Sequence, residues 1–390
     1  MILITGQGVI SALGVNVNEN WAHLQQEKSA IKKGIQSFSS PYLVGQIELS
    51  NEELKQLAQV DGDYSRTALL GMIAERESFA SHEIHPEIRT GFISGTSVGG
   101  MDLTEGEYKN YLTENETDRL ETYKQHSSGI AAYQIAQLLG ATDFINTIST
   151  ACSSAANAIM LGARLIENNQ LDRVIVGATD ALSLFTISGF RSLMIYDSEW
   201  CAPFDERRKG LNLGEGAGFI VLESEKSQKI TQSKVLGLLS GWCNASDAFH
   251  QTASSPDGQG AVLSMQGALK RANLKPEQID YVNAHGTATP NNDLSESHAL
   301  KQIFKEIPPF SSTKAYTGHT LAASGGIEAV FSLLAIEHQC LLPNLNFQNP
   351  IEETGLMPVQ KLVYEQNIKH VLSNSFGFGG NNSSIIISKY

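Results

Sequence analysis

The sequence is poor in cysteine and has no closely spaced cysteine pair. Its four cysteines, Cys152, Cys201, Cys243 and Cys340, are scattered over a chain of 390 residues. Zinc sites are normally indicated by Cys-x-x-Cys pairs, and disulfide frameworks by many regularly spaced cysteines. Neither pattern is present. We therefore expect reduced thiols, as in a cytoplasmic protein.

Basic residues and long apolar runs are also scarce. Lys and Arg number 28 against 41 Asp and Glu, a formal charge of −13, which argues against a protein whose task is to neutralise nucleic-acid phosphates. No stretch approaches the about 20 apolar residues of a membrane span. The first residues, MILITGQGVI, lack a basic leader and a cleavage site, so we expect no secretion signal. The GQGVISALG stretch lacks the third glycine of a dinucleotide-binding turn.

What is present is an ordinary globular composition, 41% hydrophobic and 18% charged, in a chain long enough for a sizeable core. Apolar strand-like runs alternate with helical patterns, as expected for an α/β protein. The same order of strands and helices occurs twice, which predicts an internal duplication with halves 1–230 and 231–390. Residues 102–125 and 178–218 are interpreted as a polar surface excursion and a loop-rich region.

Cys152 lies where one pattern changes into another. β-branched residues before it favour a strand, and the Ala-rich stretch after it, up to Ile166, has helical spacing. A thiol at a helix N-terminus faces unpaired N–H groups and the positive end of the helix dipole, which favour the thiolate. The same N–H groups suit an oxyanion formed after attack on a carbonyl. Cys152 is therefore a candidate nucleophile; the alternative is a small buried core residue.

Two histidines follow strands in the second half. His285 precedes the GTATP turn and His319 lies in TKAYTGHT. If the halves are duplicated, equivalent turns converge, and both histidines and Lys314 approach Cys152. Glu328 lies among apolar helix residues, where a buried acid needs a cation, and Lys314 is the candidate partner. Taken singly, each of these residues also fits an ordinary surface or hydrogen-bonded position.

The glycine-rich segment NSFGFGGNN, residues 374–382, is the last candidate. Its glycines permit a close approach of the backbone to a ligand. Phe376 and Phe378 give it apolar surface that suits a hydrophobic tunnel, although a tight hairpin with aromatic anchors has the same composition.

Five segments in order resemble the motifs of one family, the β-ketoacyl-[acyl-carrier-protein] synthases of the elongating type with a Cys-His-His active site. They are TACSSA at 150–155, PFDERRKGLNLGEGAG at 203–218, NAHGTATPNND at 283–293, STKAYTGHTLAASGG at 312–326 and NSFGFGGNN at 374–382. The resemblance implies a thiolase-like fold, with duplicated βαβαβαββ halves in five αβαβα layers. It also implies a homodimer, although a heterodimer with a related ketosynthase remains open.

The resemblance also implies a reaction. Cys152 would take an acyl chain from acyl-carrier protein as a thioester. His285 and His319 would then stabilise the enolate formed when malonyl-carrier protein loses CO2, which condenses with the acyl group. The backbone N–H groups of Cys152 and Phe378 would form the oxyanion hole. Neither a metal nor another cofactor is implied.

Further roles follow from the resemblance alone. Lys314 paired with Glu328 would orient His319, and Phe378 would gate the entry of malonyl groups. Other family positions, assigned to the substrate arm, the acyl tunnel or the surrounding acidic network, fall on Thr287, Thr289, Asp293, Glu296, Phe376 and Thr104. Candidates for docking an acidic carrier protein are Lys124, Arg191, Arg207, Arg208 and Lys209.

Several residues depart from the usual family pattern. The final motif reads GGNN where GGTN is usual, Lys209 stands where Asp is common, Thr104 is smaller and more polar than usual, and the loop at 112–124 is acidic where basic residues are expected. These departures leave the pathway open between fatty-acid elongation and a specialised polyketide or aryl polyene.

Three other readings remain. A non-catalytic, chain-length-factor-like partner normally lacks the nucleophile, which is present here. A thiolase normally has a second cysteine near the last glycine loop, which is absent here. A metal protein that uses the Cys and His side chains would respond to a chelator.

Overall fold

The computed structural model describes residues 1–36, 39, 41–114 and 120–390. Ten of its strands form one mixed sheet in the order β10-β9-β11-β12-β8-β1-β7-β6-β4-β5. The strands of this sheet are β1 (Ile2–Ser11), β4 (Thr90–Gly95), β5 (Phe144–Ile148), β6 (Arg173–Asp180), β7 (Gly216–Ser224), β8 (Gly237–Ser246), β9 (Tyr281–Asn283), β10 (Phe310–Ser311), β11 (His370–Gly377) and β12 (Asn381–Ser388). A separate short ladder pairs β2 (Lys32–Lys33) with β3 (Leu43–Val44).

The sheet has two five-stranded parts with one topology. From its outer edge to the centre of the sheet, the N-terminal part has the strand order β5-β4-β6-β7-β1. These are its third, second, fourth, fifth and first strands along the chain. The C-terminal part, β10-β9-β11-β12-β8, has the same order. The parts meet where β1 pairs with β8, Leu3 opposite Leu238 and Ile4 opposite Gly237. This repeat, with helices on both faces, is the thiolase-like fold that the motifs predict.

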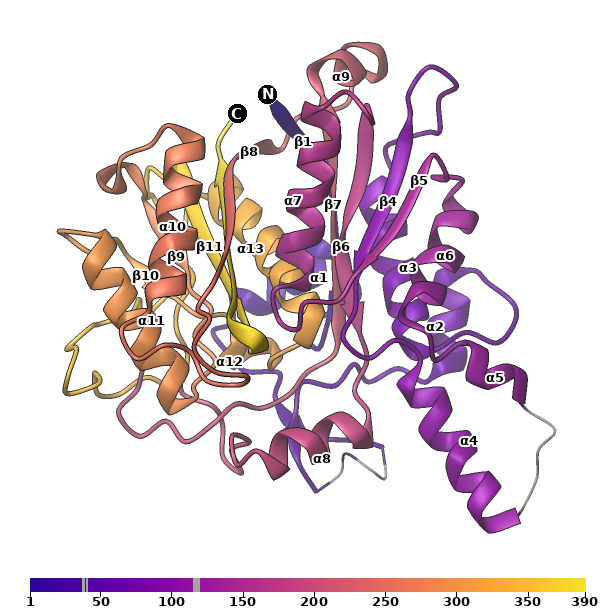
Figure 1. The fold of residues 1–390 in the computed structure, drawn as a ribbon, viewed down its shortest axis with the longest axis horizontal. Helices are drawn as coiled ribbons and strands as arrows, with labels where there is room; N and C mark the ends of the chain where they lie inside the picture. The colour runs from indigo at the N-terminus through magenta and orange to yellow at the C-terminus, as the bar shows by residue number, and fades with distance from the viewer. Residues whose placement is uncertain (37–38, 40, 115–119) are drawn as a thin grey trace.

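Helices complete the layers (Figure 1). The longer ones are α1 (Val17–Leu24), α2 (Asn51–Ala58), α3 (Arg66–Phe79), α4 (Met101–Glu114), α6 (Ser128–Leu139), α7 (Ser154–Glu167), α8 (Leu184–Ser192), α10 (Gln259–Ala272), α11 (Pro290–Ile303) and α13 (Ser324–His338). The shorter ones are α5 (Leu120–Lys124), α9 (Glu225–Thr231) and α12 (Lys314–Thr317), with single 3-10 turns η1 (Pro276–Gln278), η2 (Leu321–Ala323) and η3 (Phe378–Gly380).

Alternating strand residues show how the five layers are made. On β6, Val174 and Val176 pack into the core around α7 and α13, whereas Ile175 packs toward α3 and α6. On β12, Ile387 faces the same central core, and Ile386 packs toward α10 and α11. Because successive side chains point to opposite faces, each five-stranded part lies between two helical layers. The helices α7 and α13 form the middle layer (Figure 1).

The central position of α13 explains its composition. Leu321–His338 is long and apolar enough to cross a membrane, but it is almost entirely buried inside the protein. A helix packed between two sheets must be apolar on nearly all sides. This segment is therefore a core helix.

Some elements differ from the sequence-based expectations. β1 does not stop at the glycines of the GQGVISALG stretch but runs through Gly6 and Gly8 to Ser11. A Cβ on Gly6 would lie 2.0 Å from the Ser78 carbonyl oxygen, so these glycines serve close packing of α3 on the strand rather than a turn. Two helices, α4 and α8, lie in the regions that were expected to be a polar surface excursion and a loop-rich region. Of the acidic loop 112–124, residues 115–119 lie outside the described part.

Candidate active site

Cys152 lies on a tight turn between β5 and α7. Ala151 has a φ of 51°, a left-handed conformation that non-glycine residues adopt only under constraint. Ser154 supplies part of that constraint: its hydroxyl donates to the Ala151 carbonyl at 2.6 Å and accepts the Thr150 N–H at 2.9 Å. The turn therefore fixes Cys152 at the N-terminus of α7, as predicted, with the side chain only 5% exposed.

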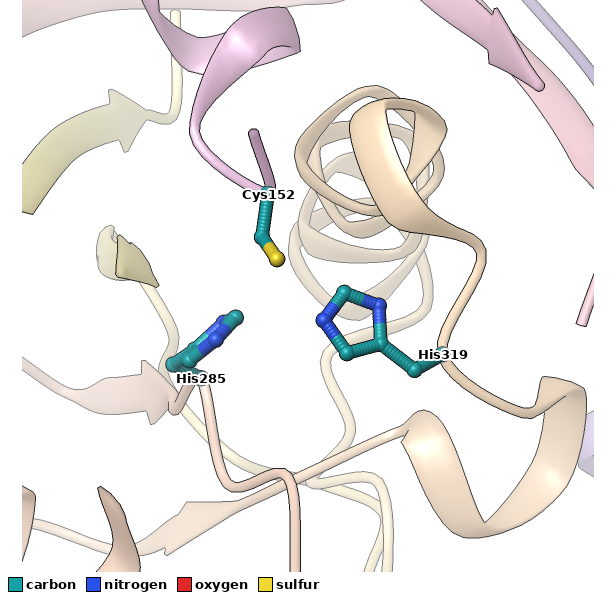
Figure 2. A group of neighbouring side chains, drawn as sticks. All are labelled: Cys152, His285 and His319. Atoms are coloured by element: carbon teal, nitrogen blue, oxygen red, sulfur yellow. The ribbon is translucent and has the colours of Figure 1, made fainter. Parts of the chain in front are cut away.

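Both predicted histidines face this cysteine. Sγ of Cys152 and one ring nitrogen from each of His285 and His319 lie within 4.8 Å of one another. The two rings are nearly perpendicular, with centroids 5.5 Å apart. Figure 2 shows both side chains pointing toward the sulfur, one from the segment after β9 and the other from the segment before α13.

His319 has a defined orientation and tautomer. Its Nδ1 accepts the backbone N–H of Leu321 at 3.1 Å and lies 3.0 Å from the Ser324 hydroxyl. Since a neutral imidazole carries one proton, Nδ1 is the acceptor and Nε2 carries the N–H. Burial, followed by the positive charge of Lys314, holds the pKa of His319 well below its usual range. The ring is therefore a neutral hydrogen-bond donor.

His285 is held through its backbone. Glu296 accepts the N–H groups of His285 and Gly286 at 2.9 and 2.8 Å, while Nδ1 of the His285 ring is buried without a hydrogen-bond partner among the described residues. Burial, then Lys314 and His319, keep the pKa of His285 well below its usual range. Both imidazoles are therefore neutral at physiological pH.

The predicted thiolate is not the resting state of Cys152. Burial raises the pKa of the thiol to about 11, although Lys314 and the N–H groups of Cys152 and Phe378 act in the opposite direction. The helix terminus contributes as expected, but desolvation outweighs it. The expectation of a resting thiolate was therefore wrong, and the sulfur can act as a nucleophile only after its proton is removed.

Lys314 and Glu328 form the predicted ion pair. The Nζ of Lys314 donates to Oε1 of Glu328, and both side chains are 3% exposed. Burial raises the pKa of Glu328 to about 7, against the effect of Lys314. Lys314 therefore favours the charged form of the acid without fully offsetting its burial, and the charge of Lys314 lowers the pKa of both histidines.

A cavity of about 320 Å³ opens onto these groups. Its lining includes the predicted site residues Cys152, His285, His319, Thr287, Thr289, Phe376 and Phe378. The Phe378 ring stacks on Phe190 of α8, with centroids 5.7 Å apart. The stack places the glycine-rich loop against a helix that the sequence did not predict.

Other predicted residues lie outside the lining. The carboxylate of Asp293 is fully buried and accepts the N–H groups of Phe204 and Ala288, so it braces the turn after His285, as Glu296 does. Thr104 lies on α4, where its hydroxyl is 2.9 Å from Nδ1 of His126. Among the carrier-docking candidates, Lys209 lines the cavity mouth.

Asp180 is a site residue that the sequence analysis missed. This buried carboxylate accepts the Thr96 hydroxyl at 2.5 Å and the Ala322 N–H at 2.8 Å, and it raises the pKa of Cys152. It thus joins the end of β4 to the turn after His319. The sequence feature that could have identified Asp180 is its position as a lone acid at the end of the apolar run RVIVGATD.

Comparison with known proteins decides the family. Residues 1–228 match the family description "Beta-ketoacyl synthase, N-terminal domain", and residues 236–348 match "Beta-ketoacyl synthase, C-terminal domain". The chain belongs to the β-ketoacyl synthase family. It is a condensing enzyme of the acyltransferase class, and its cysteine and two histidines occupy the positions of that family's motifs.

Relatives of this β-ketoacyl synthase cover its full length. It is 32% identical to 3-oxoacyl-[acyl-carrier-protein] synthase 2 of Staphylococcus aureus (strain COL), over 100% of this chain and 98% of the relative. It is 31% identical to the protein of that name from Synechocystis sp., with the same coverage.

Solved structures of ketosynthases are similar throughout. The ishigamide ketosynthase/chain length factor has a TM-score of 0.92 at 25% identity, covering 100% of this chain and 99% of that one. A ketosynthase in complex with its chain length factor from Xenorhabdus doucetiae has a TM-score of 0.86 at 30% identity, covering 100% and 98%. A type II ketosynthase in complex with its acyl-carrier protein has a TM-score of 0.88 at 27% identity, covering 100% and 99%.

Proposed function

We propose that this β-ketoacyl synthase transfers an acyl chain from acyl-carrier protein to Cys152 and condenses it with malonyl-carrier protein, in fatty-acid elongation. The observation that carries the proposal is the pair of neutral imidazoles facing a cysteine at a helix N-terminus. Neutral N–H donors stabilise an enolate oxygen without neutralising it, which suits a decarboxylation.

In the first half-reaction, Cys152 attacks the thioester carbonyl. Its proton passes to an imidazole and then to the departing pantetheine sulfur, so one thioester replaces another. Because Nδ1 of His319 is engaged and its Nε2 is a donor, His285 is the ring that takes the proton. Its Nδ1 has no partner among the described residues that would fix one tautomer, so the ring accepts a proton here and donates an N–H in the second half-reaction. The N–H groups of Cys152 and Phe378 stabilise the tetrahedral oxyanion, since both already act on the Cys152 sulfur.

In the second half-reaction, the malonyl thioester loses CO2 and its carbonyl oxygen becomes an enolate, to which His285 and His319 donate. The enolate carbon then attacks the acyl carbonyl on Cys152. The new carbon–carbon bond replaces the bond to sulfur, and one proton is taken up as the thiol reforms. Buried Lys314, paired with Glu328, keeps both histidines neutral, and the pair orients His319.

The remaining predicted residues have proposed roles around this chemistry. Thr287 and Thr289, which line the cavity, contact the pantetheine arm, and Phe376 contacts the substrate. Phe378 gates malonyl entry. Asp293 and Glu296 act by positioning the His285 turn. Thr104, outside this cavity, lines the acyl tunnel.

The proposal includes a cytoplasmic location, two catalytic halves at 1–230 and 231–390, and a homodimer. A second candidate is condensation in a specialised polyketide or aryl polyene pathway, alone or as a heterodimer with a related ketosynthase. It is favoured by the likeness to the ishigamide ketosynthase/chain length factor and to a ketosynthase complexed with its chain length factor. The preferred acyl group separates the two pathways.

The test is intact-protein mass after incubation with a panel of acyl-carrier-protein thioesters, saturated and polyenoic. The wild type and Cys152→Ala are compared, then malonyl-carrier protein is added and products are analysed. We expect an acyl adduct that requires Cys152 and is discharged as a β-ketoacyl product. Absence of an adduct with every donor would refute the nucleophile assignment. Because thiol and imidazoles are also zinc ligands, a chelator arm is included, and we expect it to leave activity unchanged.

A further inference from the structure

The oxyanion hole of the proposed reaction depends on two segments that are distant in sequence. One N–H belongs to Cys152, at the start of α7, and the other to Phe378, in the loop between β11 and β12. Donors stabilise an oxyanion only when both lie at hydrogen-bond distance from the same oxygen. Something must therefore hold the glycine-rich loop against the cysteine turn.

Gly377 permits the close approach of these segments. A Cβ at this position would lie 2.8 Å from the Thr150 carbonyl oxygen and 3.3 Å from the Cys152 nitrogen. The backbone of the loop therefore packs directly on the turn. Close packing alone does not fix the distance between the N–H groups of Cys152 and Phe378. The nearby Gly379 and Gly380 have φ values of 81° and 73°, and glycines add conformational freedom to the loop.

Asn381, directly after these glycines, makes the hydrogen bonds that hold the loop against the cysteine turn. Its side-chain Oδ1 lies 2.8 Å from the Ser153 hydroxyl, 2.9 Å from Nδ2 of Asn157 and 2.6 Å from Nδ2 of Asn244. Ser153 follows the nucleophile, Asn157 lies in the first turn of α7, and Asn244 lies on β8. One carbonyl oxygen thus joins the loop to the nucleophile's helix and to the neighbouring strand.

The rest of the cluster is anchored as well. Asn157 also donates to the Thr150 hydroxyl at 2.8 Å, and its Oδ1 lies 3.1 Å from both Asn244 Nδ2 and the Ser383 hydroxyl. Asn381 is the residue that makes GGNN differ from the more usual GGTN. A threonine hydroxyl is shorter and cannot bridge the same three donors.

We propose that Asn381 is a positioning residue that sets the spacing of the two oxyanion-hole N–H groups, through Ser153 and Asn157. It does not touch the reacting atoms. This inference rests on the proposed function. Its consequence is selective: acyl transfer at Cys152 passes through the tetrahedral oxyanion, whereas malonyl decarboxylation is stabilised by His285 and His319.

The experiment compares acylation and decarboxylation in Asn381→Leu, which keeps the size of the side chain and removes its acceptor. We expect self-acylation from acyl-carrier protein, followed by intact mass, to slow by roughly 10- to 100-fold, the scale of a misplaced catalytic group. Decarboxylation of malonyl-carrier protein, measured in Cys152→Ala with and without Asn381→Leu, should stay within about two-fold because its donors are untouched.

Two further variants keep the result interpretable. Ser383→Ala removes two hydrogen bonds of the same cluster, to Asn157 and from Asn244, without removing any contact of Asn381, and it should acylate like the wild type. Asn381→Thr should give an intermediate rate. Equal acylation by wild type and Asn381→Leu would overturn the inference, as would a parallel loss of acylation, decarboxylation and melting temperature. Failure of the wild type itself to acylate would instead overturn the proposed function.

Discussion

The backbone N–H of Leu321 donates to Nδ1 of His319 at 3.1 Å, so a residue two positions along the chain decides which ring nitrogen faces Cys152 with a proton. Because this bond fixes Nε2–H as an enolate donor, we expect His319→Ala to lower malonyl decarboxylation by about 10²- to 10³-fold. Alkylation of Cys152 by iodoacetamide should change far less. Comparable losses in both assays would contradict the assigned donor role.

The pKa of Cys152 predicts an unusual pH dependence. With a pKa raised to about 11 by burial, the thiolate fraction increases about ten-fold per pH unit across pH 7–10. The rate of alkylation of the wild type should therefore rise throughout that range. A plateau near pH 7 would instead show that the helix terminus dominates over desolvation.

The pair Lys314 and Glu328 predicts asymmetric effects of mutation. Lys314→Met leaves a buried acid without its cation and should lower the free energy of unfolding by about 3–5 kcal/mol. The double variant Lys314→Met/Glu328→Leu should recover most of that loss in urea unfolding. Because Lys314 lowers the pKa of both histidines, the acid limb of the decarboxylation profile should move to higher pH in the single variant. A double variant as unstable as the single one would contradict the pairing argument.

Glu75 predicts a pH effect on stability far from the chemistry. This residue of α3 is buried, and burial raises its pKa to about 8. Between the unfolded value of 4.5 and pH 8, the folded state holds a proton that the unfolded state releases, so stability falls as pH rises, by up to about 1.4 kcal/mol per unit. Glu75→Gln should flatten this slope and be more stable than the wild type at pH 8. If the free energy of unfolding, measured in urea, has the same pH dependence in the wild type and in Glu75→Gln, the raised pKa of Glu75 is disproved.

Lys209 predicts how the carrier protein docks. This exposed lysine lines the cavity mouth, where a positive charge favours an acidic partner. Lys209→Glu should raise the KM for acyl-carrier protein by about 3- to 10-fold, more at low salt, with Cys152 alkylation unchanged. Lys361→Glu, an exposed lysine outside that lining, is the matched control. Equal KM values for both variants would place docking elsewhere.

The sequence was most informative where chemistry and local pattern coincide. The change from β-branched to Ala-rich residues at Cys152 predicted the turn between β5 and α7, and the isolated acid in α13 predicted a pair with Lys314. The repeated strand order also agrees with the observed topology. The sequence misjudged α8, because this short segment, LFTISGFRS, contains a glycine and two β-branched residues that disfavour a helix until packing against neighbouring segments stabilises it.

Sequence alone thus determined the residue types of the site and the order of the elements that carry them. Tertiary structure decided what depends on distance and burial. Desolvation overrides the helix terminus at Cys152, and a backbone N–H selects the tautomer of His319. Asn381 reaches the nucleophile's helix from the far end of the chain. These effects depend on groups brought together only by folding, and no local sequence pattern contains them.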